Sequence, residues 1–531
     1  MAGDGTLRPA MKKLCILSLA VFLLTPLVAL AEEATIRGEP IIKDDFERCA
    51  PRDKILNDEN RSGFWNLRYK TWGDNNLLYG NPDAPDIAYD PALKGFYDIE
   101  VESRATDRAG GFGLKLSSET EFTVLHVPNE GATPKTHFNV WLPFRKNVRL
   151  DNAKLIIHYT GNAAYISAFK FIPIGRFTRF QPLEANEPGP STGVICKQLG
   201  RYIGWPTIVR TSKDELIVTF SGDRDAHVCP WGKTQMIRST DNGKTWCKIV
   251  TINNTPLDDR DSGIIETGRG TLLVSWFTSL YFERPGVMRD SWRQHAAKIG
   301  PEMRQQWLGN WVRRSEDNGR TWDAPSRTAG SAPHGPIALK DGRLLYVGTY
   351  GGSGPADRIV VEESKDDGVT WQQLAMLSSP PKFYADEPHV VECANGRLVA
   401  MFRNEHPELS KRFLGQSESE DGGKTWSPIH LTEIWGFPPH LIRLNDGRLL
   451  MVYGHRRSPF GQRACLSNDN GQTWDLKHEI TLVDNAPDGD LGYPASAQLG
   501  DGTILTIYYQ KDQPAEKTCL MATHWRLPAS Q

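Results

Sequence analysis

Ser239-Thr-Asp-Asn-Gly-Lys-Thr-Trp246 is an octapeptide that recurs five times in this chain and decides the fold. The other copies are Ser315–Trp322, Ser364–Trp371, Ser419–Trp426 and Ser467–Trp474. Their Trp-to-Trp steps are 76, 49, 55 and 48 residues, a period typical of repeat architectures. In each copy Asp can accept backbone N–H groups in a turn, Gly can take the left-handed conformation and Trp can pack between sheets. We therefore interpret these Asp residues as structural.

A second motif, a tight turn between two apolar strands, precedes the octapeptide and occurs six times. Turns of this kind need a positive φ, which Asp-Gly and Asn-Gly supply. The six turns are Asp214-Glu215-Leu216, Arg269-Gly270-Thr271, Asp341-Gly342-Arg343, Asn395-Gly396-Arg397, Asp446-Gly447-Arg448 and Asp501-Gly502-Thr503. Four strands per unit at this period predict a six-bladed β-propeller. The sixth unit has no octapeptide, so we expect residues Val194–Leu199 to supply its outer strand and close the ring.

The chain before the repeats contains two further segments. Residues 1–31 have a basic start, a short apolar run and a small-x-small site, which predict a cleaved secretory signal and hence a secreted or periplasmic protein. A membrane anchor is the alternative. Residues 32–182 alternate in the manner of a β-sandwich, whereas 183–531 hold the propeller. The sandwich aromatics form either a carbohydrate-binding platform or a core; they are Trp65, Tyr69, Trp72, Tyr79 and Trp141.

Composition limits the partners and cofactors. The net charge of −2 gives no reason to expect nucleic acid as a partner. Apart from the signal, no segment is apolar enough to span a bilayer. The cysteines are too widely spaced for a zinc pattern, and no other ligand cluster stands out, so we predict no metal and no cofactor. One or two disulfides could form in an exported chain.

Five octapeptides on a six-blade repeat resemble the sialidase superfamily, whose members carry this sequence as the Asp box. The resemblance implies a retaining exo-glycosidase with a tyrosine nucleophile and a glutamate base. In Asp386-Glu387-Pro388-His389, Glu387 resembles the base, and Arg403 resembles one arginine of the family's carboxylate-binding triad. Arg463 resembles a second arginine of that triad. Tyr493, in Gly492-Tyr493-Pro494, resembles the nucleophile.

Blade one departs from the family pattern. Gly204-Trp205-Pro206 stands where the family has Arg-Ile-Pro, so one arginine is missing, and Arg201 is a candidate substitute. Arg224 resembles another binding arginine. Asp225 is the nearest candidate for the general acid, with Asp223 and His227 as alternatives, because histidine titrates near neutral pH.

Arginines around a pocket favour an anionic sugar, because guanidinium binds carboxylate through two parallel hydrogen bonds. Sialic acid on a glycan is the leading candidate, and a related nonulosonate or a uronate fits the same logic. We also expect an insertion at residues 277–311 to cover the pocket and supply the missing charge; it contains Arg284, Arg289, Arg293, Arg304, Trp292, Trp307 and Trp311.

The sequence leaves two other functions open. One is a lyase or glycosidase of different chemistry acting on acidic polysaccharide, for which histidine candidates are His227, His389, His440 and His455. The other is a non-catalytic glycan-binding propeller, favoured by the altered first blade.

Overall fold

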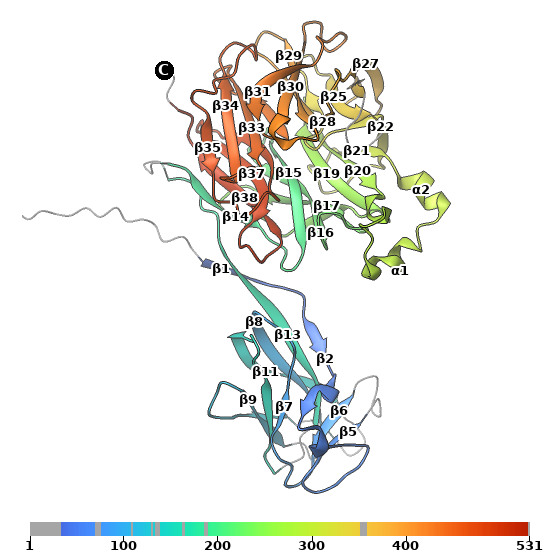
Figure 1. Cartoon of the computed structure of the whole chain (residues 1–531), viewed down its shortest axis with the longest axis vertical. Coiled ribbons are helices and arrows are strands. Elements are labelled where there is room, and N and C mark those ends of the chain that lie inside the picture. The colour runs from blue at the N-terminus through green and yellow to red at the C-terminus, as the bar shows by residue number, and fades with distance from the viewer. Residues whose placement is uncertain are drawn as a thin grey trace, which may run out of the picture.

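The computed structural model describes residues 33–68, 76–107, 110–128, 131–132, 138–161, 165–184, 189–350 and 358–528. The signal segment, Tyr69 and Trp72 lie outside these residues. The described chain is built almost entirely of strands (Figure 1). No helix within it has the length and apolar character needed to cross a membrane.

Six antiparallel sheets follow one another around the propeller. Blade one contains β15 (Tyr202–Arg210), β16 (Leu216–Arg224), β17 (Lys233–Ser239) and β18 (Val250–Asn253). Blade two contains β19 (Asp258–Glu266), β20 (Leu272–Ser279), β21 (Asn310–Ser315) and β22 (Ser326–Thr328). Blade three has a broken inner strand; it contains β23 (Gly330–Ser331), β24 (Ile337–Ala338), β25 (Leu344–Tyr350), β26 (Arg358–Ser364) and β27 (Gln372–Ser378).

The last three blades repeat this order of strands. Blade four contains β28 (Ala385–Glu392), β29 (Leu398–Asn404), β30 (Phe413–Ser419) and β31 (His430–Trp435). Blade five contains β32 (Pro439–Arg443), β33 (Leu449–His455), β34 (Gly461–Ser467) and β35 (Ile480–Val483). Blade six contains β36 (Gly492–Gln498), β37 (Ile504–Lys511), β38 (Thr518–Trp525) and β14 (Ser191–Cys196).

The ring closes between the two ends of the propeller segment. Strand β14 pairs antiparallel with β38, and Val194 lies opposite Met521. This pairing joins residues more than 300 positions apart and covers the edge that β38 would otherwise expose. The predicted fold class, an all-β six-bladed propeller preceded by a sandwich, is confirmed.

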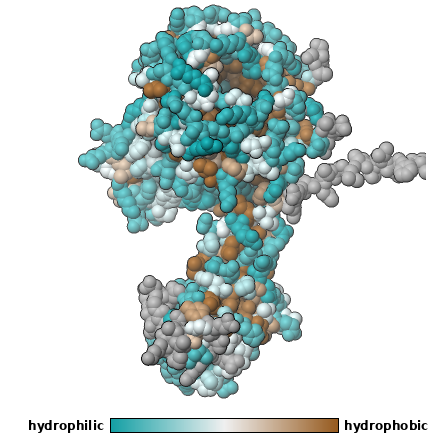
Figure 2. All heavy atoms as spheres, turned by 180° about the vertical axis from the view of Figure 1, so that it is seen from behind, coloured by the Kyte–Doolittle hydropathy of each residue, from teal (hydrophilic) through white to brown (hydrophobic). Residues whose placement is uncertain are grey.

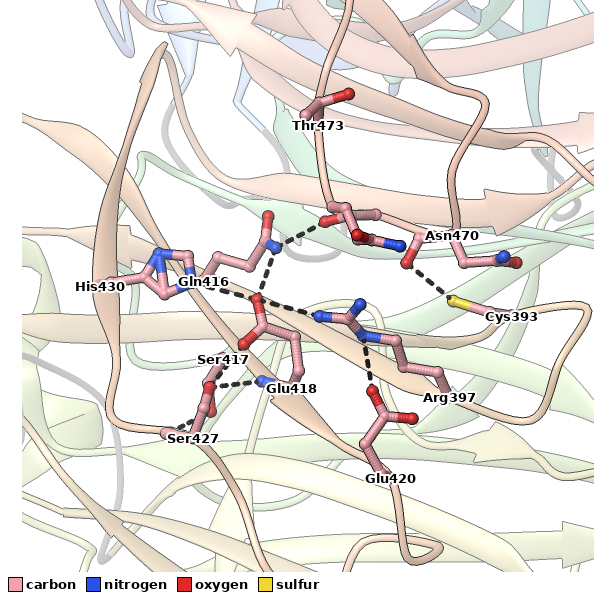
Figure 3. Close-up of polar contacts among 12 residues, drawn as sticks. Cys393, Arg397, Gln416, Ser417, Glu418, Glu420, Ser427, His430, Asn470 and Thr473 are labelled. Atoms are coloured by element: carbon pink, nitrogen blue, oxygen red, sulfur yellow. Dashed lines mark hydrogen bonds and ion pairs between the residues drawn. The ribbon is translucent and has the colours of Figure 1, made fainter.

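The Asp boxes hold turns, as their composition predicts. Asp241 accepts hydrogen bonds from the Ser239 hydroxyl at 2.7 Å and from the Thr245 amide at 2.9 Å, while Gly243 has φ +86°. The fifth box also links two blades, because Gln416 of β30 donates to the Gly471 carbonyl at 2.7 Å (Figure 3). Trp474 donates back to the Gln416 side chain at 2.8 Å. The boxes therefore stabilise turns and blade contacts.

The N-terminal part is a sandwich of two sheets. The larger sheet contains β1 (Glu33–Arg37), β2 (Ile41–Lys43), β4 (Ile55–Asn57), β5 (Trp65–Arg68), β6 (Leu77–Gly80), β8 (Phe96–Ala105), β11 (Phe138–Arg149) and β13 (Tyr165–Thr178). The smaller sheet contains β3 (Cys49–Ala50), β7 (Ile87–Tyr89), β9 (Gly111–Leu116), β10 (Thr123–His126) and β12 (Leu155–Tyr159). Trp65 is buried in the shared core, and Tyr79 stacks on Tyr165, so neither is a free platform residue. Trp141 instead lies under the Lys170 ammonium.

A waist joins the two parts, and hydrophobic residues gather along it (Figure 2). A cavity of about 860 Å³ lies there between the sandwich and the propeller. Arg201 and Asp223 line it on the propeller side, and Phe96 and Tyr97 line it on the sandwich side.

The insertion in blade two forms short helices at the rim of the propeller, including α1 (Arg293–Ala296) and α2 (Pro301–Trp307) (Figure 1). Its core contains Phe282 and Trp292, which are packed with Leu257. The seven cysteines of the described residues are free thiols, so none of the expected disulfides is present among them.

Candidate active site

Four inner strands begin with the same irregularity. Trp205, Asp261, Glu387 and Tyr493 have φ of 54°, 51°, 43° and 50°, in the left-handed region that side chains seldom adopt. At each of them the pairing with the next strand shifts register. A bulge of this kind re-aims a side chain, and strained backbone of this kind clusters at functional sites. The four bulges come from blades one, two, four and six.

Two of these residues meet directly. The Tyr493 hydroxyl donates to Glu387 Oε1, and Arg403 Nη1 donates to Tyr493 Oη at 3.2 Å. Arg403 Nη1 also donates to Glu387 Oε2 at 2.5 Å. The structure thus brings together three residues that the sequence placed in blades four and six.

Burial keeps the Tyr493 hydroxyl protonated. Its side chain is almost fully buried, and burial, followed by the Glu387 charge, raises its pKa well above the ordinary value. Arg403 opposes this rise. A tyrosine in this state can act as a nucleophile only if a base removes its proton, and Glu387 is placed to do so.

Arg403 is held by carboxylates on both sides. Besides Glu387 it forms an ion pair with Glu405, which in turn pairs with Arg412 at 2.8 Å. The Arg403 guanidinium lies 4.8 Å from the centre of the Phe437 ring. This packing fixes the guanidinium beside the Tyr493 hydroxyl.

In blade five the arginine at the cluster differs from the expected one. Arg463 lies on β34, away from the inner strand, and its Nη1 donates to the Val483 carbonyl at 2.7 Å. Arg456 follows β33, donates to the Leu491 carbonyl at 2.8 Å and lies 5.6 Å from the Tyr493 ring centre. The sequence did contain a signal for Arg456. It lies at the end of the second strand of blade five, as Arg403 does in blade four.

In blade one Arg224 is fully buried and already neutralised. Its two terminal nitrogens lie 2.6 and 2.9 Å from the Asp258 carboxylate. It also donates to the His227 carbonyl at 2.9 Å. Arg224 therefore has no exposed surface and its charge is already paired within the protein.

Arg201, Asp223 and Asp225 form a separate group. Arg201 donates to Asp223 Oδ1 at 2.8 Å and to Asp225 Oδ1 at 2.5 Å. Asp225 Oδ2 accepts from the Trp292 indole at 3.0 Å. No hydrogen bond or ion pair between described residues joins this group to Tyr493 or Glu387. Arg201 is thus paired with Asp223 and Asp225 rather than with the Tyr493 cluster.

His227 is the acid candidate that reaches the cluster. Its ring lies edge-on to Trp205 at 4.9 Å, and Trp205 lies 6.3 Å from the Tyr493 ring. Nδ1 of His227 is 3.1 Å from the Tyr202 hydroxyl and 3.7 Å from Asp490. Burial lowers the pKa of His227, the Arg260 charge lowers it further, and Asp490 partly offsets this. About half of the side chain is exposed, so its free nitrogen can meet a leaving group.

The other histidines serve packing. His389 and His440 stack at 4.5 Å, with His334 4.8 Å from His440. The Nδ1 atoms of His389 and His440 accept from the backbone amides of Leu441 and Ser496. Burial lowers the pKa of all three, that of His389 to about 3. His455 is held at the surface by the Pro459 carbonyl. No group suited to hold a metal ion occurs within the described ranges.

The insertion contacts the Asp225 loop through Trp292, but its arginines are held locally. Arg304 forms a bidentate pair with Glu283, and Arg293 pairs with Asp290. Arg284 and Arg289 stack on Tyr281 and Trp292. The expectation that this segment supplies the missing charge therefore has no support in the geometry.

Residues 294–506 match the family described as a BNR repeat-like domain. A sialidase of Bacteroides fragilis is 24% identical over 57% of this chain and 59% of its own length. The xyloglucanase Xgh74A of Acetivibrio thermocellus is 26% identical over 32% of this chain and 21% of its own. The chain thus spans less than two thirds of these curated relatives. A solved protein of unknown function from Dyadobacter fermentans has a TM-score of 0.54 at 23% identity, covering 64% of this chain and all of that one, which supports the fold.

Proposed function

We propose that this chain, a member of the sialidase/BNR-repeat superfamily of β-propellers, is a retaining exo-glycosidase that releases a terminal acidic sugar, sialic acid first among them, from glycans. One observation carries the proposal: the Tyr493 hydroxyl donates to Glu387 while Arg403 touches both. A buried tyrosine, a base and a cation at one point are the parts of a covalent displacement at an anomeric carbon.

In the first step Tyr493 Oη bonds to the anomeric carbon as Glu387 takes the hydroxyl proton. The bond to the leaving oxygen breaks, and His227 protonates that oxygen. A neutral phenol nucleophile suits an acidic sugar because a carboxylate nucleophile would be repelled by the substrate carboxylate. Arg403 and Arg456 lie within reach of that carboxylate beside the Tyr493 ring.

In the second step water attacks the same carbon after losing a proton to His227. The carbon–Tyr493 bond breaks, and the proton held by Glu387 returns to the phenolate. Two displacements restore the original anomeric configuration. Because the pKa of His227 is lowered, its acid form is most abundant below pH 6.5, and we expect turnover to be faster on that side.

The decisive experiment traps the intermediate. A sialosyl fluoride carrying fluorine at the neighbouring carbon should leave a covalent sugar on wild type, located by peptide mass spectrometry on the peptide containing Tyr493. Tyr493→Phe should form no adduct and should release no sugar from a 4-methylumbelliferyl sialoside. Tyr508→Phe is the matched control, since Tyr508 is a buried tyrosine of β37 whose hydroxyl bonds to Thr523.

Two results would overturn the proposal. One is an adduct on another residue; the other is full activity of Tyr493→Phe. Inactivity of wild type on all acidic sugar glycosides, together with activity on neutral ones, would retain the nucleophile and reject the substrate class.

A further inference from the structure

Arg260 stands out among the arginines near Tyr493. It precedes the Asp261 bulge on β19, and its half-buried guanidinium makes no hydrogen bond or ion pair with any described residue. Its Nε is buried without an acceptor. By contrast Arg224, Arg403 and Arg456 all donate to protein oxygens. Buried donors are nearly always paired, so an unpaired guanidinium indicates an acceptor that arrives with a ligand.

Aromatic rings fix where Arg260 lies. Its guanidinium carbon is 4.9 Å from the centre of the Trp205 ring and 5.7 Å from that of Phe277. Trp205 directly follows Gly204, the first-blade position at which the resemblance led us to expect an arginine, and its ring lies 6.3 Å from that of Tyr493. Arg260 and Tyr493 therefore both neighbour the Trp205 ring, and cation–π contact holds Arg260 there.

The charges around Arg260 leave its cation uncompensated. The neighbouring carboxyl is that of Asp261, and burial raises its pKa to about 7, so a large part of it is protonated near neutral pH. One Asp261 oxygen is likewise buried without a donor or acceptor. The Trp205 ring also carries Arg224 at 4.9 Å, but Asp258 neutralises that arginine.

We propose that Arg260 binds the carboxylate of the acidic sugar in place of the missing first-blade arginine, and so sets the preference for acidic over neutral sugars. The inference rests on the proposed function. Its two terminal nitrogens can hold a carboxylate through parallel hydrogen bonds. Arg260 lies in blade two, whereas the family pattern places the missing arginine in blade one.

Binding measurements separate this role from catalysis. The probes are 2-deoxy-2,3-didehydro-N-acetylneuraminic acid and its methyl ester, titrated calorimetrically into the full chain. Wild type should prefer the acid, and Arg260→Met should reduce the acid-to-ester affinity ratio about 10- to 100-fold, as expected for loss of a charged hydrogen-bonded contact. Arg260→Lys should restore part of the ratio.

The matched control is Arg284→Met, because Arg284 also stacks on an aromatic ring, Tyr281, but lies on the insertion. It should leave both affinities unchanged. If Arg260→Met is not folded by circular dichroism, Arg260→Gln, which keeps an N–H donor without the charge, replaces it. A wild-type ratio in the folded Arg260 variant would overturn this inference and leave the proposed function intact. A wild type that binds neither probe would overturn both.

Discussion

The hydroxyl of Tyr493 donates a hydrogen bond to the carboxylate of Glu387 across 106 residues of sequence, from blade six to blade four. The two residues meet because each lies at a bulge with positive φ at the start of an inner strand. Inner strands converge on the axis of a propeller, so equivalent positions in different blades become neighbours. The geometry explains how a phenol that burial holds protonated can still be activated.

Glu387→Gln should therefore lower kcat by about 10²- to 10⁴-fold, the usual contribution of a positioned general base. The amide keeps the shape of the side chain but cannot take the Tyr493 proton. Steady-state kinetics on an aryl sialoside would measure the effect. The control is Glu392→Gln at the far end of the same strand, where Glu392 accepts from the Lys340 amide. An equal loss in both variants would contradict the assignment of Glu387.

His227→Ala should lower kcat/KM by a factor that depends on the leaving group of the substrate. An aryl sialoside with an acidic phenol leaves without a proton and should lose little in its first step, whereas a sialyl-galactoside should lose about 10²-fold or more in kcat/KM. Comparing the two substrates provides the measurement. Asp225 is the general-acid candidate that the sequence favoured, but it is held by Arg201 and Trp292. Asp225→Ala should therefore change kcat/KM by the same factor for both substrates. If only Asp225→Ala showed this dependence on the leaving group, Asp225 rather than His227 would be the general acid.

Arg224→Met should destabilise the fold rather than weaken substrate binding. The change leaves the Asp258 carboxylate buried without its partner, at a cost of about 3–5 kcal/mol of unfolding free energy. Urea unfolding would measure this cost. The double variant Arg224→Met, Asp258→Leu should recover most of it, since no unpaired charge remains. If a stable Arg224→Met protein had only a raised KM, Arg224 would instead contact substrate.

Acid should weaken the fold through the buried histidines. His334, His389 and His440 have folded-state pKa values below their ordinary 6.5, so the unfolded chain binds more protons as the pH falls through 6.5. Each histidine then lowers the unfolding free energy by about 1.4 kcal/mol per pH unit. For His389 this continues down to about pH 3. Unfolding free energies of wild type and His389→Gln between pH 7 and 5 should show a shallower slope in the variant; parallel slopes would contradict the prediction.

Asp469→Ala should lower stability without changing catalysis. Asp469 accepts from the Ser467 hydroxyl at 2.8 Å and from the Thr473 amide at 2.9 Å, which shape the fifth turn box. We expect a fall of about 2–4 °C in Tm, corresponding to about 1 kcal/mol, and an unchanged kcat/KM. The comparison is Asp475→Ala, a surface aspartate just beyond the box. A large loss of kcat/KM would instead give the box a role in the reaction.

The repeats, the six blades and the closing strand were predictable because each depends on local patterns. Asp-Gly and Asn-Gly turns, alternating strands and the octapeptide are read within a few residues. The nucleophile and base candidates, Tyr493 and Glu387, came from the resemblance of their segments to those of the sialidase superfamily. The motifs could not show that Arg456 rather than Arg463 is the blade-five arginine near Tyr493. That choice depends on which strand of blade five faces the axis.

Blade one shows the same limit more clearly. From the sequence Arg224 is an arginine at the end of a strand, a suitable binding residue, but the fold places Asp258 against it and buries both. Arg260 has no motif at all, and its importance lies in the absence of a partner among the described residues. Whether a side chain is buried or paired depends on its neighbours, and these neighbours lie on other blades.

Turn chemistry and strand alternation act between near neighbours, so the amino-acid sequence is enough to show that this chain forms blades and where their inner strands begin. The arrangement of the charges comes from the tertiary structure: Asp258 neutralises Arg224, and Arg463 bonds to the Val483 carbonyl. Arg403 and Arg456 lie beside Tyr493, and Arg260 lies against Trp205. The physical reason is that the availability of a charge depends on its distance to other charges and on its exclusion from water, and both are set by segments far apart in the chain.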